Sequence, residues 1–273
     1  MSLLEPATLE RALSTAEAAA REAGALLLEH LGRLDPAALR TKSSARDLQS
    51  AADIASERCI VKRLRAAFPD FAIEAEEEVH DARLDGRPRW FLDPLDGTVN
   101  FVSRLPAFSV SIALYETDAH GSLVPSVAIV FVPRLAEMFT AVRGGGAFEN
   151  GLPMRVSQTE QLGDAILATG FPYRRNELRN NNLENWNRFF LDVRGLRRMG
   201  SAAMDLAYVA SGRFDGFWEL HLAPHDVAAG ALLVREAGGR VTDVDGGGDW
   251  LRGGHIVAAG PHLFERVRAG VQR

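Results

Sequence analysis

One short apolar segment and the polar turn behind it constrain this chain of 273 residues more than any other feature. Residues 90–92 form a Trp-Phe-Leu run that is typical of a buried strand. The sequence then reads Asp-Pro-Leu-Asp-Gly-Thr, and Pro94 and Gly97 predict that the strand breaks within this stretch. Asp93 and Asp96 therefore stand at the end of a strand, where a rigid scaffold can present reactive groups.

Asp93 and Asp96 are spaced so that both carboxylates can converge on one point. Their like charges repel, so we expect a cation between them, and a hard divalent ion such as Mg²⁺ suits an all-oxygen site. Gly97 permits close approach of a ligand to the backbone, and Thr98 adds a hydroxyl and an N–H, which together predict a phosphate cradle. The alternative is an ordinary surface turn, because Asp-Pro and Asp-Gly are common turn formers.

A second segment carries Asp226 at the start of an apolar helical pattern that ends at Gly238-Gly239. Asp226 falls where an N-cap residue is expected, so its carboxylate would point away from a helix N-terminus. An isolated aspartate in this position can also serve as a cap alone.

A third acidic segment, residues 76–78, follows the apolar run at 71–73. A run of three glutamates is usually a solvated face, so this segment alone carries little weight.

Taken together, the three segments resemble the inositol monophosphatase family of Mg²⁺-dependent, lithium-sensitive sugar-phosphate phosphatases. The first family signature resembles residues 93–98 with Asn100-Phe101 behind them, and the acidic pair of the family resembles Glu76-Glu77. The second signature resembles Asp226 with residues 228–230 and the terminal glycine pair. Order and spacing agree across most of the chain.

The resemblance implies two Mg²⁺ ions in the site. Glu76, Asp93 and the carbonyl of Leu95 would bind one ion. Asp93, Asp96 and Asp226 would bind the other, so that Asp93 bridges the pair.

The resemblance also implies the catalytic residues. Residues 42–53 are similar to the mobile active-site loop of the family and the helix after it, which makes Asp53 the partner of Thr98. These two residues, with Glu76, would activate a water for direct attack on phosphorus, without a covalent phosphoenzyme. Without the resemblance, Asp53 is only a polar residue on an amphipathic helix.

Substrate contacts follow from the same resemblance. Asp96, Gly97 and Thr98 would face the phosphate. Residues 198–206 resemble the segment that contacts the sugar, with Ala202 as the matching contact, and Glu219 resembles the carboxylate that accepts hydrogen bonds from inositol hydroxyls.

His225 departs from the family pattern, which usually has Trp directly before the metal-binding aspartate. We weigh two interpretations. In the favoured one His225 is a smaller packing substitute, and in the other its imidazole touches the substrate or modulates the metal site.

Composition restricts the remaining functions. The net charge of −5 lacks the basic excess of a nucleic-acid binder, and the N-terminal pattern is that of neither a signal peptide nor a membrane span. Cys59 is the sole cysteine, expected in the core, so no internal disulfide forms and a cytoplasmic setting is favoured. We therefore expect a small phosphate monoester as partner, with no nucleic acid and no membrane.

The periodicity predicts an α/β (α+β) fold in two halves, residues 1–154 with helices over an antiparallel sheet and residues 155–273 with alternating strands and helices. The resemblance implies a layered αβαβα sandwich with the site between the halves, and a homodimer. The expected helices are 6–31, 47–67, 176–193, 200–212 and 226–238. The expected strands are 71–74, 88–93, 108–115, 124–132, 136–142, 165–169, 214–220, 241–244 and 256–259.

Inositol 1-phosphate is the first substrate that the resemblance suggests, and histidinol phosphate, fructose 1,6-bisphosphate and 3′-phosphoadenosine 5′-phosphate remain open. The Arg174-Arg175 and Arg197-Arg198 pairs could bind the second phosphate of a bisphosphate. An aspartyl-phosphate mechanism fits poorly, because its two aspartates would stand two apart rather than three. A metal- or phosphate-binding protein without turnover is the non-enzymatic alternative.

Overall fold

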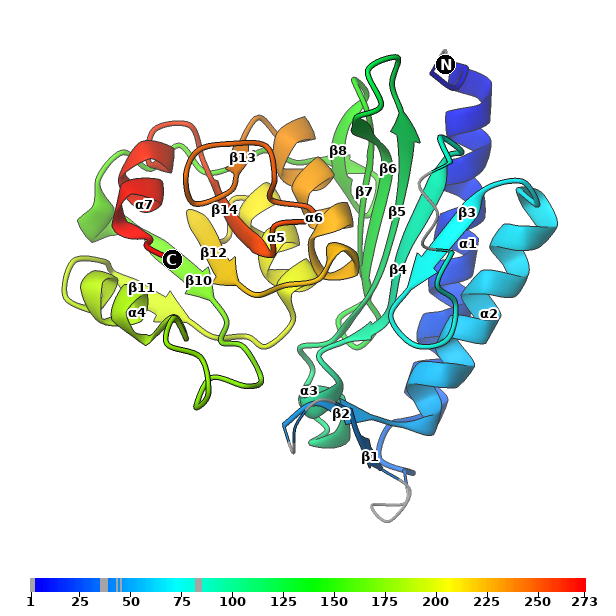
Figure 1. Cartoon of the computed structure of the whole chain (residues 1–273), viewed down its shortest axis with the longest axis horizontal. Coiled ribbons are helices and arrows are strands. Elements are labelled where there is room, and N and C mark those ends of the chain that lie inside the picture. Colours follow the sequence, from blue (N-terminus) through cyan, green and yellow to red (C-terminus); the bar gives the residue numbers. More distant parts are fainter. Residues whose placement is uncertain (1–2, 35–38, 43, 45, 82–84) are drawn as a thin grey trace.

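Five layers of helix and sheet make up the molecule in the computed structural model, which describes residues 3–34, 39–42, 44, 46–81 and 85–273 (Figure 1). Helices α1 (Pro6–His30) and α2 (Ala51–Ala67) cover one face of a seven-stranded sheet. Helices α5 (Ala202–Ala210) and α6 (Pro224–Glu236) cover the other face and separate it from a five-stranded sheet. Helices α4 (Leu183–Phe190) and α7 (Phe264–Gly270) form the fifth layer. The predicted αβαβα sandwich is confirmed.

The large sheet has the strand order β3-β4-β5-β6-β7-β8-β9, in which only β3 and β4 pair in parallel. Its β-branched and aromatic strands are buried on both faces because helices cover both sides. The strands are β3 (Ala72–Ala75), β4 (Arg89–Asp96), β5 (Ser109–Thr117), β6 (Leu123–Val132), β7 (Glu137–Val142), β8 (Gly146–Glu149) and β9 (Leu152–Pro153).

The smaller sheet has the order β11-β10-β12-β14-β13, with β10 parallel to both of its neighbours. A two-stranded ribbon of β1 (Arg40–Thr41) and β2 (Leu48–Gln49) precedes α2, and the short helix α3 (Thr98–Val102) follows β4. The strands of the smaller sheet are β10 (Ile166–Thr169), β11 (Gly195–Arg197), β12 (Gly216–Leu220), β13 (Arg240–Thr242) and β14 (His255–Ala259).

Helix α1 shows how close the layers pack. Pro6 stands in its first turn, where no backbone N–H is needed, and a stripe of small residues faces β5 and β6. A Cβ built on Gly24 would lie 2.4 Å from a ring carbon of Phe131, so only glycine allows this approach. No helix within the described part of the chain is long and apolar enough to cross a lipid bilayer.

Four sequence expectations about local structure need correction. Strand β4 does not break at Pro94 but continues to Asp96, with a shift of register against β5 between Asp93 and Asp96. Proline is tolerated at such an irregularity because no ladder hydrogen bond is required of its nitrogen. Cys59 is only partly buried and lies beside Glu22 on α1, so it is not a core residue.

Asp226 is the third correction, because it is not the N-cap of α6. Pro224 starts the helix earlier, Ala223 is the N-cap, and Asp226 lies in the first turn. Its carboxylate accepts a hydrogen bond of 2.6 Å from the backbone N–H of Ala223, which is one half of a capping box.

The predicted helix over residues 176–193 is also shorter than expected, since only α4 forms there.

Candidate active site

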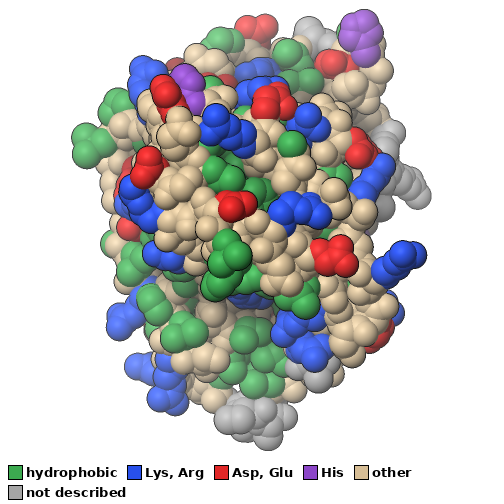
Figure 2. Space-filling model, turned by 90° about the vertical axis from the view of Figure 1, so that its left-hand side faces the viewer, with side chains coloured by type: hydrophobic (Ala, Val, Ile, Leu, Met, Phe, Trp, Pro, Cys, Tyr) green, Lys and Arg blue, Asp and Glu red, His purple; other side chains and the backbone are tan. Residues whose placement is uncertain are grey.

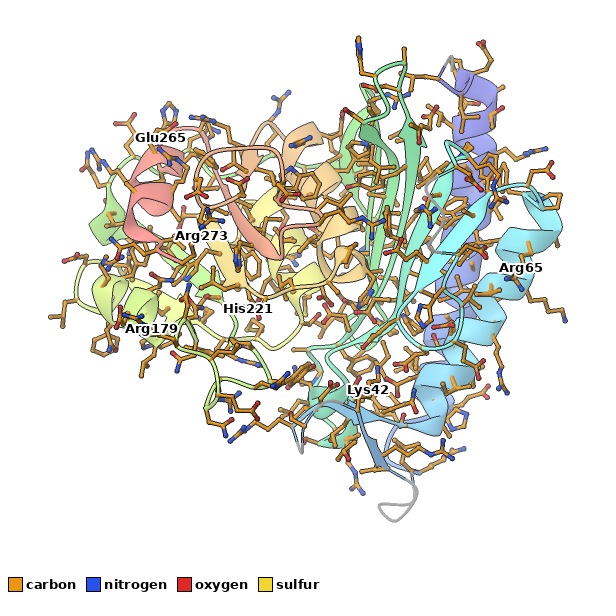
Figure 3. All side chains as sticks on the ribbon, viewed as in Figure 1. Lys42, Arg65, Arg179, His221, Glu265 and Arg273 are labelled. Carbon is orange, nitrogen blue, oxygen red and sulfur yellow. The ribbon has the colours of Figure 1, made fainter. Side chains whose placement is uncertain are left out.

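The predicted metal-binding residues meet in one pocket between the two halves. Its volume is about 250 Å³, and Lys42 from the N-terminal half and His221 from the C-terminal half both line it (Figure 3). The other residues that line it are Asp47, Glu76, Asp93, Leu95, Asp96, Gly97, Thr98, Tyr173, Ala223, His225 and Asp226.

Strand β4 supplies the floor of this pocket. The irregular pairing at its end lets Asp93 and Asp96 face the same cavity, since a regular strand would place residues three apart on opposite faces. Asp93 Oδ1 accepts a hydrogen bond of 3.0 Å from the N–H of Leu95, which holds the turn. Gly97 follows with a φ of 93°, in the left-handed region, and a Cβ there would lie 3.0 Å from the carbonyl oxygen of Ala107.

Asp96 connects the two halves of the molecule. Its Oδ2 accepts hydrogen bonds from the Ser201 hydroxyl at 2.7 Å and from the Ala203 N–H at 2.8 Å. Both donors belong to the first turn of α5, of which Ser201 is the N-cap. The start of α5 is therefore fixed against the end of β4.

The carboxylates of the pocket repel one another. Burial, followed by the charges of Glu76, Asp96 and Asp226, raises the pKa of Asp93 well above its usual range. Burial and the charge of Asp226 raise the pKa of Asp96 to about 7. Burial also raises the pKa of Asp226. The pocket thus concentrates negative charge that a cation would relieve.

Lys42 supplies one cation at the edge of the pocket. Its ammonium group lies 2.7 Å from Glu76 and 2.5 Å from Glu77. Burial alone would raise the pKa of Glu76, but the charges of His225 and Lys42 lower it overall. The predicted loop that contains Lys42 also includes residues 43 and 45, which lie outside the described residues.

The donor set fits Mg²⁺ by its chemistry. Carboxylates and a main-chain carbonyl are the ligands that this hard cation prefers. Among the described residues, no three His, Cys, Asp or Glu side chains already stand in an arrangement that would hold a metal ion. The carboxylates would therefore have to close on the ion, and Lys42 would have to yield its contact with Glu76.

Thr98 and Asp53 are joined as the resemblance implied. The Thr98 hydroxyl lies 2.9 Å from Asp53 Oδ1 and 3.2 Å from the carbonyl oxygen of Leu95. Asp53 is fully buried at the start of α2, where its other oxygen accepts hydrogen bonds from the backbone N–H and the hydroxyl of Ser50. Burial raises the pKa of Asp53 although these hydrogen bonds oppose the shift.

A second, smaller cavity of about 100 Å³ adjoins the first through Asp96, Tyr173, His221 and Asp226. Ala202 and Glu219 both line it. Glu219 is buried at the end of β12, and burial raises its pKa to about 8.

His225 lines the carboxylate pocket, and its Nε2 lies 3.8 Å from Asp226 Oδ1. The imidazole therefore faces the site rather than the core, which favours the second of the two interpretations over simple packing.

Sequence reasoning missed Glu57, which organises the acidic segment. Its buried carboxylate accepts hydrogen bonds of 2.7–2.9 Å from the backbone N–H groups of Glu77, Glu78 and Val79. Glu57 stands one helical turn after Asp53, and this spacing on one face of α2 is the signal that could have found it. The three glutamates are also not equivalent, since Glu78 pairs with Arg58 at the surface.

Comparisons with known proteins agree with this geometry. Residues 8–273 match the model of the inositol monophosphatase family. An inositol-1-monophosphatase from Rhizobium meliloti is 43% identical over 252 residues, which cover 92% of each chain. A Nus factor SuhB from Escherichia coli is 41% identical over 260 residues, which cover 95% of each chain.

Solved structures give the same result. An inositol monophosphatase from Anabaena (Nostoc) matches with a TM-score of 0.85 and 37% identity over 96% of both chains. An extragenic suppressor protein suhB from Bartonella henselae matches with a TM-score of 0.86 and 38% identity, over 96% of this chain and 99% of that one. The chain therefore belongs to the inositol monophosphatase family, a family of metal-dependent phosphatases.

Proposed function

We propose that this protein hydrolyses inositol 1-phosphate to inositol and phosphate in a reaction that requires Mg²⁺ and is inhibited by Li⁺. The observation that carries the proposal is the pocket that the carboxylates of Glu76, Asp93, Asp96 and Asp226 share with Thr98, whose hydroxyl donates a hydrogen bond to Asp53. The family and the named activity of the Rhizobium meliloti relative support it.

The pocket divides into two sets of ligands under this proposal. Glu76, Asp93 and the Leu95 carbonyl would hold one Mg²⁺, and Asp93, Asp96 and Asp226 would hold the other. When bound, such a pair of ions stabilises negative charge on the attacking and leaving oxygens and lowers the pKa of a bound water.

Thr98 and Asp53 position the attacking water, with Glu76 beside them. A water that donates a hydrogen bond to the Thr98 hydroxyl can pass a proton to it while Thr98 passes its own proton to Asp53. The resulting hydroxide attacks phosphorus in line, and the inositol alkoxide leaves and takes a proton from solvent, to which Asp53 returns the proton that it accepted. The raised pKa of Asp53 suits a group that must accept a proton.

The substrate lies across both cavities. Its phosphate rests against Asp96, Gly97 and Thr98, where the backbone approaches closely because residue 97 has no side chain. Its inositol ring enters the smaller cavity, where Ala202 contacts the ring and Glu219 accepts a hydroxyl hydrogen bond.

A panel of phosphate esters tests the proposal. Release of phosphate is measured from inositol 1-phosphate, histidinol phosphate, fructose 1,6-bisphosphate and 3′-phosphoadenosine 5′-phosphate, with and without Mg²⁺ and Li⁺. We expect inositol 1-phosphate to be turned over fastest, only with Mg²⁺, and more slowly with Li⁺. Turnover that is equally fast in the presence of a chelator would contradict the metal-dependent reaction.

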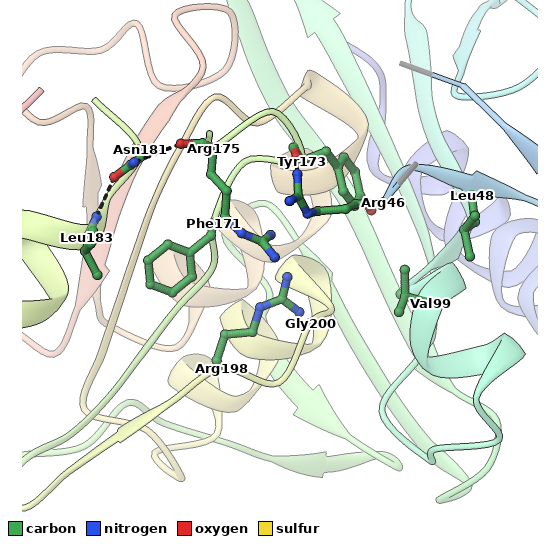
Figure 4. Close-up of a pocket in the computed structure, with 11 residues that line it drawn as sticks. Arg46, Leu48, Val99, Phe171, Tyr173, Arg175, Asn181, Leu183, Arg198 and Gly200 are labelled. Atoms are coloured by element: carbon green, nitrogen blue, oxygen red, sulfur yellow. Dashed lines mark hydrogen bonds between the residues drawn. The ribbon is translucent and has the colours of Figure 1, made fainter. Parts of the chain in front are cut away.

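A bisphosphate is the second candidate substrate, and an arginine cluster favours it. Arg46, Arg175 and Arg198 line a cavity of about 740 Å³ beside Gly97, and their guanidinium groups turn toward its centre (Figure 4). Burial, followed by the charges of Arg46 and Arg198, lowers the pKa of Arg175. Faster turnover of fructose 1,6-bisphosphate than of inositol 1-phosphate would assign this cluster to a second phosphate.

A protein that binds without turnover is the remaining alternative. Several relatives carry the name Nus factor, and a shared fold does not decide between such a role and catalysis. Tight binding of phosphate esters with no phosphate release would support the binder.

We also propose that the protein is a cytoplasmic homodimer. The face in Figure 2 carries hydrophobic side chains between charged ones, and Leu183, Phe190 and Leu191 of the α4 region are 52%, 60% and 86% exposed. Sedimentation of the purified chain tests the dimer, and a monomer at micromolar concentration would contradict it. Cell fractionation tests the location.

A further inference from the structure

Asp205 is a buried carboxylate that the proposed reaction does not use. It lies on α5, is 1% exposed, and lines the same small cavity as Ala202 and Glu219. Ala202 and Asp205 stand three residues apart, so both lie on the face of α5 that is turned toward this cavity.

The carboxylate of Asp205 lacks the partners that a buried charge normally has. Its Oδ1 is buried and has no hydrogen-bond donor among the described residues. Asp96, at the other side of the same cavity, shows the usual situation, since a hydroxyl and a backbone N–H both donate to it. Buried polar atoms without a partner are rare in folded proteins, and each one calls for a reason.

The charged groups around Asp205 do not provide that reason. Burial, followed by the charges of Glu219 and Asp96, raises the pKa of Asp205, and Arg198 opposes this shift. Arg198 acts on Asp205 through its charge, and the described residues show no hydrogen bond between the two side chains. Oδ1 itself is enclosed, whereas the Asp205 side chain contributes to the lining of the cavity, so the carboxylate can meet a ligand only from the cavity side.

We propose that Asp205 is a specificity-determining residue. Its carboxylate accepts a hydrogen bond from one donor on the alcohol half of the substrate, next to the donor whose hydrogen bond Glu219 accepts. This proposal rests on the proposed function, because it assigns the alcohol half of a phosphate ester to the small cavity. Substrates with two neighbouring donors remote from the phosphate satisfy both carboxylates, and an ester without such donors leaves both unpartnered.

A hydroxyl and an ammonium group can both be this donor, and two variants distinguish them. Asp205→Asn keeps an acceptor oxygen without the charge, whereas Asp205→Ala removes both. If the donor is a hydroxyl, Asn should retain most of the selectivity that Ala loses. If the donor is an ammonium group, both variants should lose the selectivity to the same extent, because the negative charge of the carboxylate is what binds a cation.

The test compares kcat/KM for inositol 1-phosphate, histidinol phosphate and ethyl phosphate, which carries no further donor. Wild type and both variants are assayed with Mg²⁺. For Asp205→Ala we expect kcat/KM to fall at least about tenfold for the preferred donor-bearing ester and to stay within about twofold for ethyl phosphate. An equal fall for all three esters, or no fall for any, would overturn the proposal.

Thermal unfolding separates this role from a structural one. The Asp205→Ala variant should melt at the same temperature as the wild type or higher, because it loses a buried carboxylate without partners. A lower melting temperature together with equal losses for all esters would assign Asp205 to folding.

The activity of the wild type distinguishes a failure of the proposed function from a failure of the role proposed for Asp205. Turnover of ethyl phosphate shows that the phosphatase works, whatever Asp205 does. If no ester is turned over, the proposed function fails, and titration calorimetry of inositol 1-phosphate against ethyl phosphate then measures the selectivity of wild type and variants directly. Equal affinities of wild type and Asp205→Ala for inositol 1-phosphate would overturn the role of Asp205.

Discussion

Asp93 is the most enclosed of the carboxylates that line the active-site pocket, with 2% of its surface exposed. Three acidic neighbours, Glu76, Asp96 and Asp226, raise its pKa beyond the effect of burial. A residue in this position can touch both proposed ions, so its charge matters more than that of any single neighbour.

The Asp93→Asn variant should lose nearly all activity. Removing the bridging charge removes several kcal/mol of stabilisation, which corresponds to a loss of about a thousandfold in turnover. The measurement is kcat at saturating Mg²⁺, with thermal unfolding in chelator as the control. In chelator the variant should be at least as stable as wild type, because one of several mutually repelling carboxylates has been removed. Activity above about a tenth of wild type would contradict the bimetal assignment.

Thr98→Ala tests the activation of water. Loss of a positioned proton acceptor should slow kcat by about a hundredfold while KM changes little. Thr98→Ser is the matched control, because it keeps the hydroxyl that lies 2.9 Å from Asp53, and it should retain most of the rate. A full rate in the Ala variant would remove Thr98 from the mechanism.

At the scale of the element, the close contact of α5 with α6 sets the position of Asp226. A Cβ on Gly230 of α6 would lie 2.4 Å from Cβ of Leu206 on α5. Asp226 stands one turn before Gly230 on the same helix, and Asp96 holds the start of α5. Separation of the two helices would therefore move Asp226 away from Asp96, the two residues proposed to bind the same ion.

Gly230→Ala should lower the free energy of unfolding by about 1–3 kcal/mol, because the added methyl overpacks the helix contact. It should also reduce kcat, since Asp226 moves with α6. Gly248→Ala is the control, because a Cβ there meets no atom within 4 Å and should change neither quantity. Equal melting temperatures for the two variants would show that the contact can relax without cost.

Sequence patterns predicted the long elements well and the short ones poorly. The alanine-rich stripe of α1 and the β-branched strands β5, β6 and β7 appear close to the expected bounds. Strands β8, β9 and β11 and helix α7 were missed, since elements of two to seven residues leave little periodicity to detect. The position of Asp226 was misjudged by a turn because Pro224 at the first helical position outweighs aspartate as a start signal.

The candidate site could be predicted only where a family motif covered it. Asp93, Asp96 and Asp226 come together as expected. The contacts of Lys42 and Asp205 could not be predicted, because they depend on segments far apart in the sequence, whereas Glu57 was missed although its spacing from Asp53 on α2 pointed to it. The roles assigned to all these residues, and the boundary at residue 154, stay predictions.

For the whole molecule, the raised pKa values couple stability to pH. The pKa of Asp96 rises from 3.8 to about 7 in the folded chain without metal. Between pH 3.8 and about 7, the folded chain therefore binds more protons than the unfolded chain. The stability that this protonation gives is fully present below about pH 4 and is lost as the pH rises through about 7.

Mg²⁺ should reverse this loss, since it binds the deprotonated carboxylates. The rise in melting temperature on addition of Mg²⁺ should therefore be larger at pH 8 than at pH 5.5. Thermal unfolding at both pH values checks this, with Asp93→Asn as a control that should show a smaller rise at pH 8. A rise of equal size at both pH values would contradict protonation of the ligands in the metal-free protein.

The most direct test of the account is the rate of phosphate release from inositol 1-phosphate by chelator-treated protein as Mg²⁺ is added back. The account predicts no release in chelator, a saturable increase with Mg²⁺, and inhibition when Li⁺ is added at the saturating concentration. Release in chelator at the rate seen with Mg²⁺ would contradict it, because the carboxylate pocket would then have no part in the reaction.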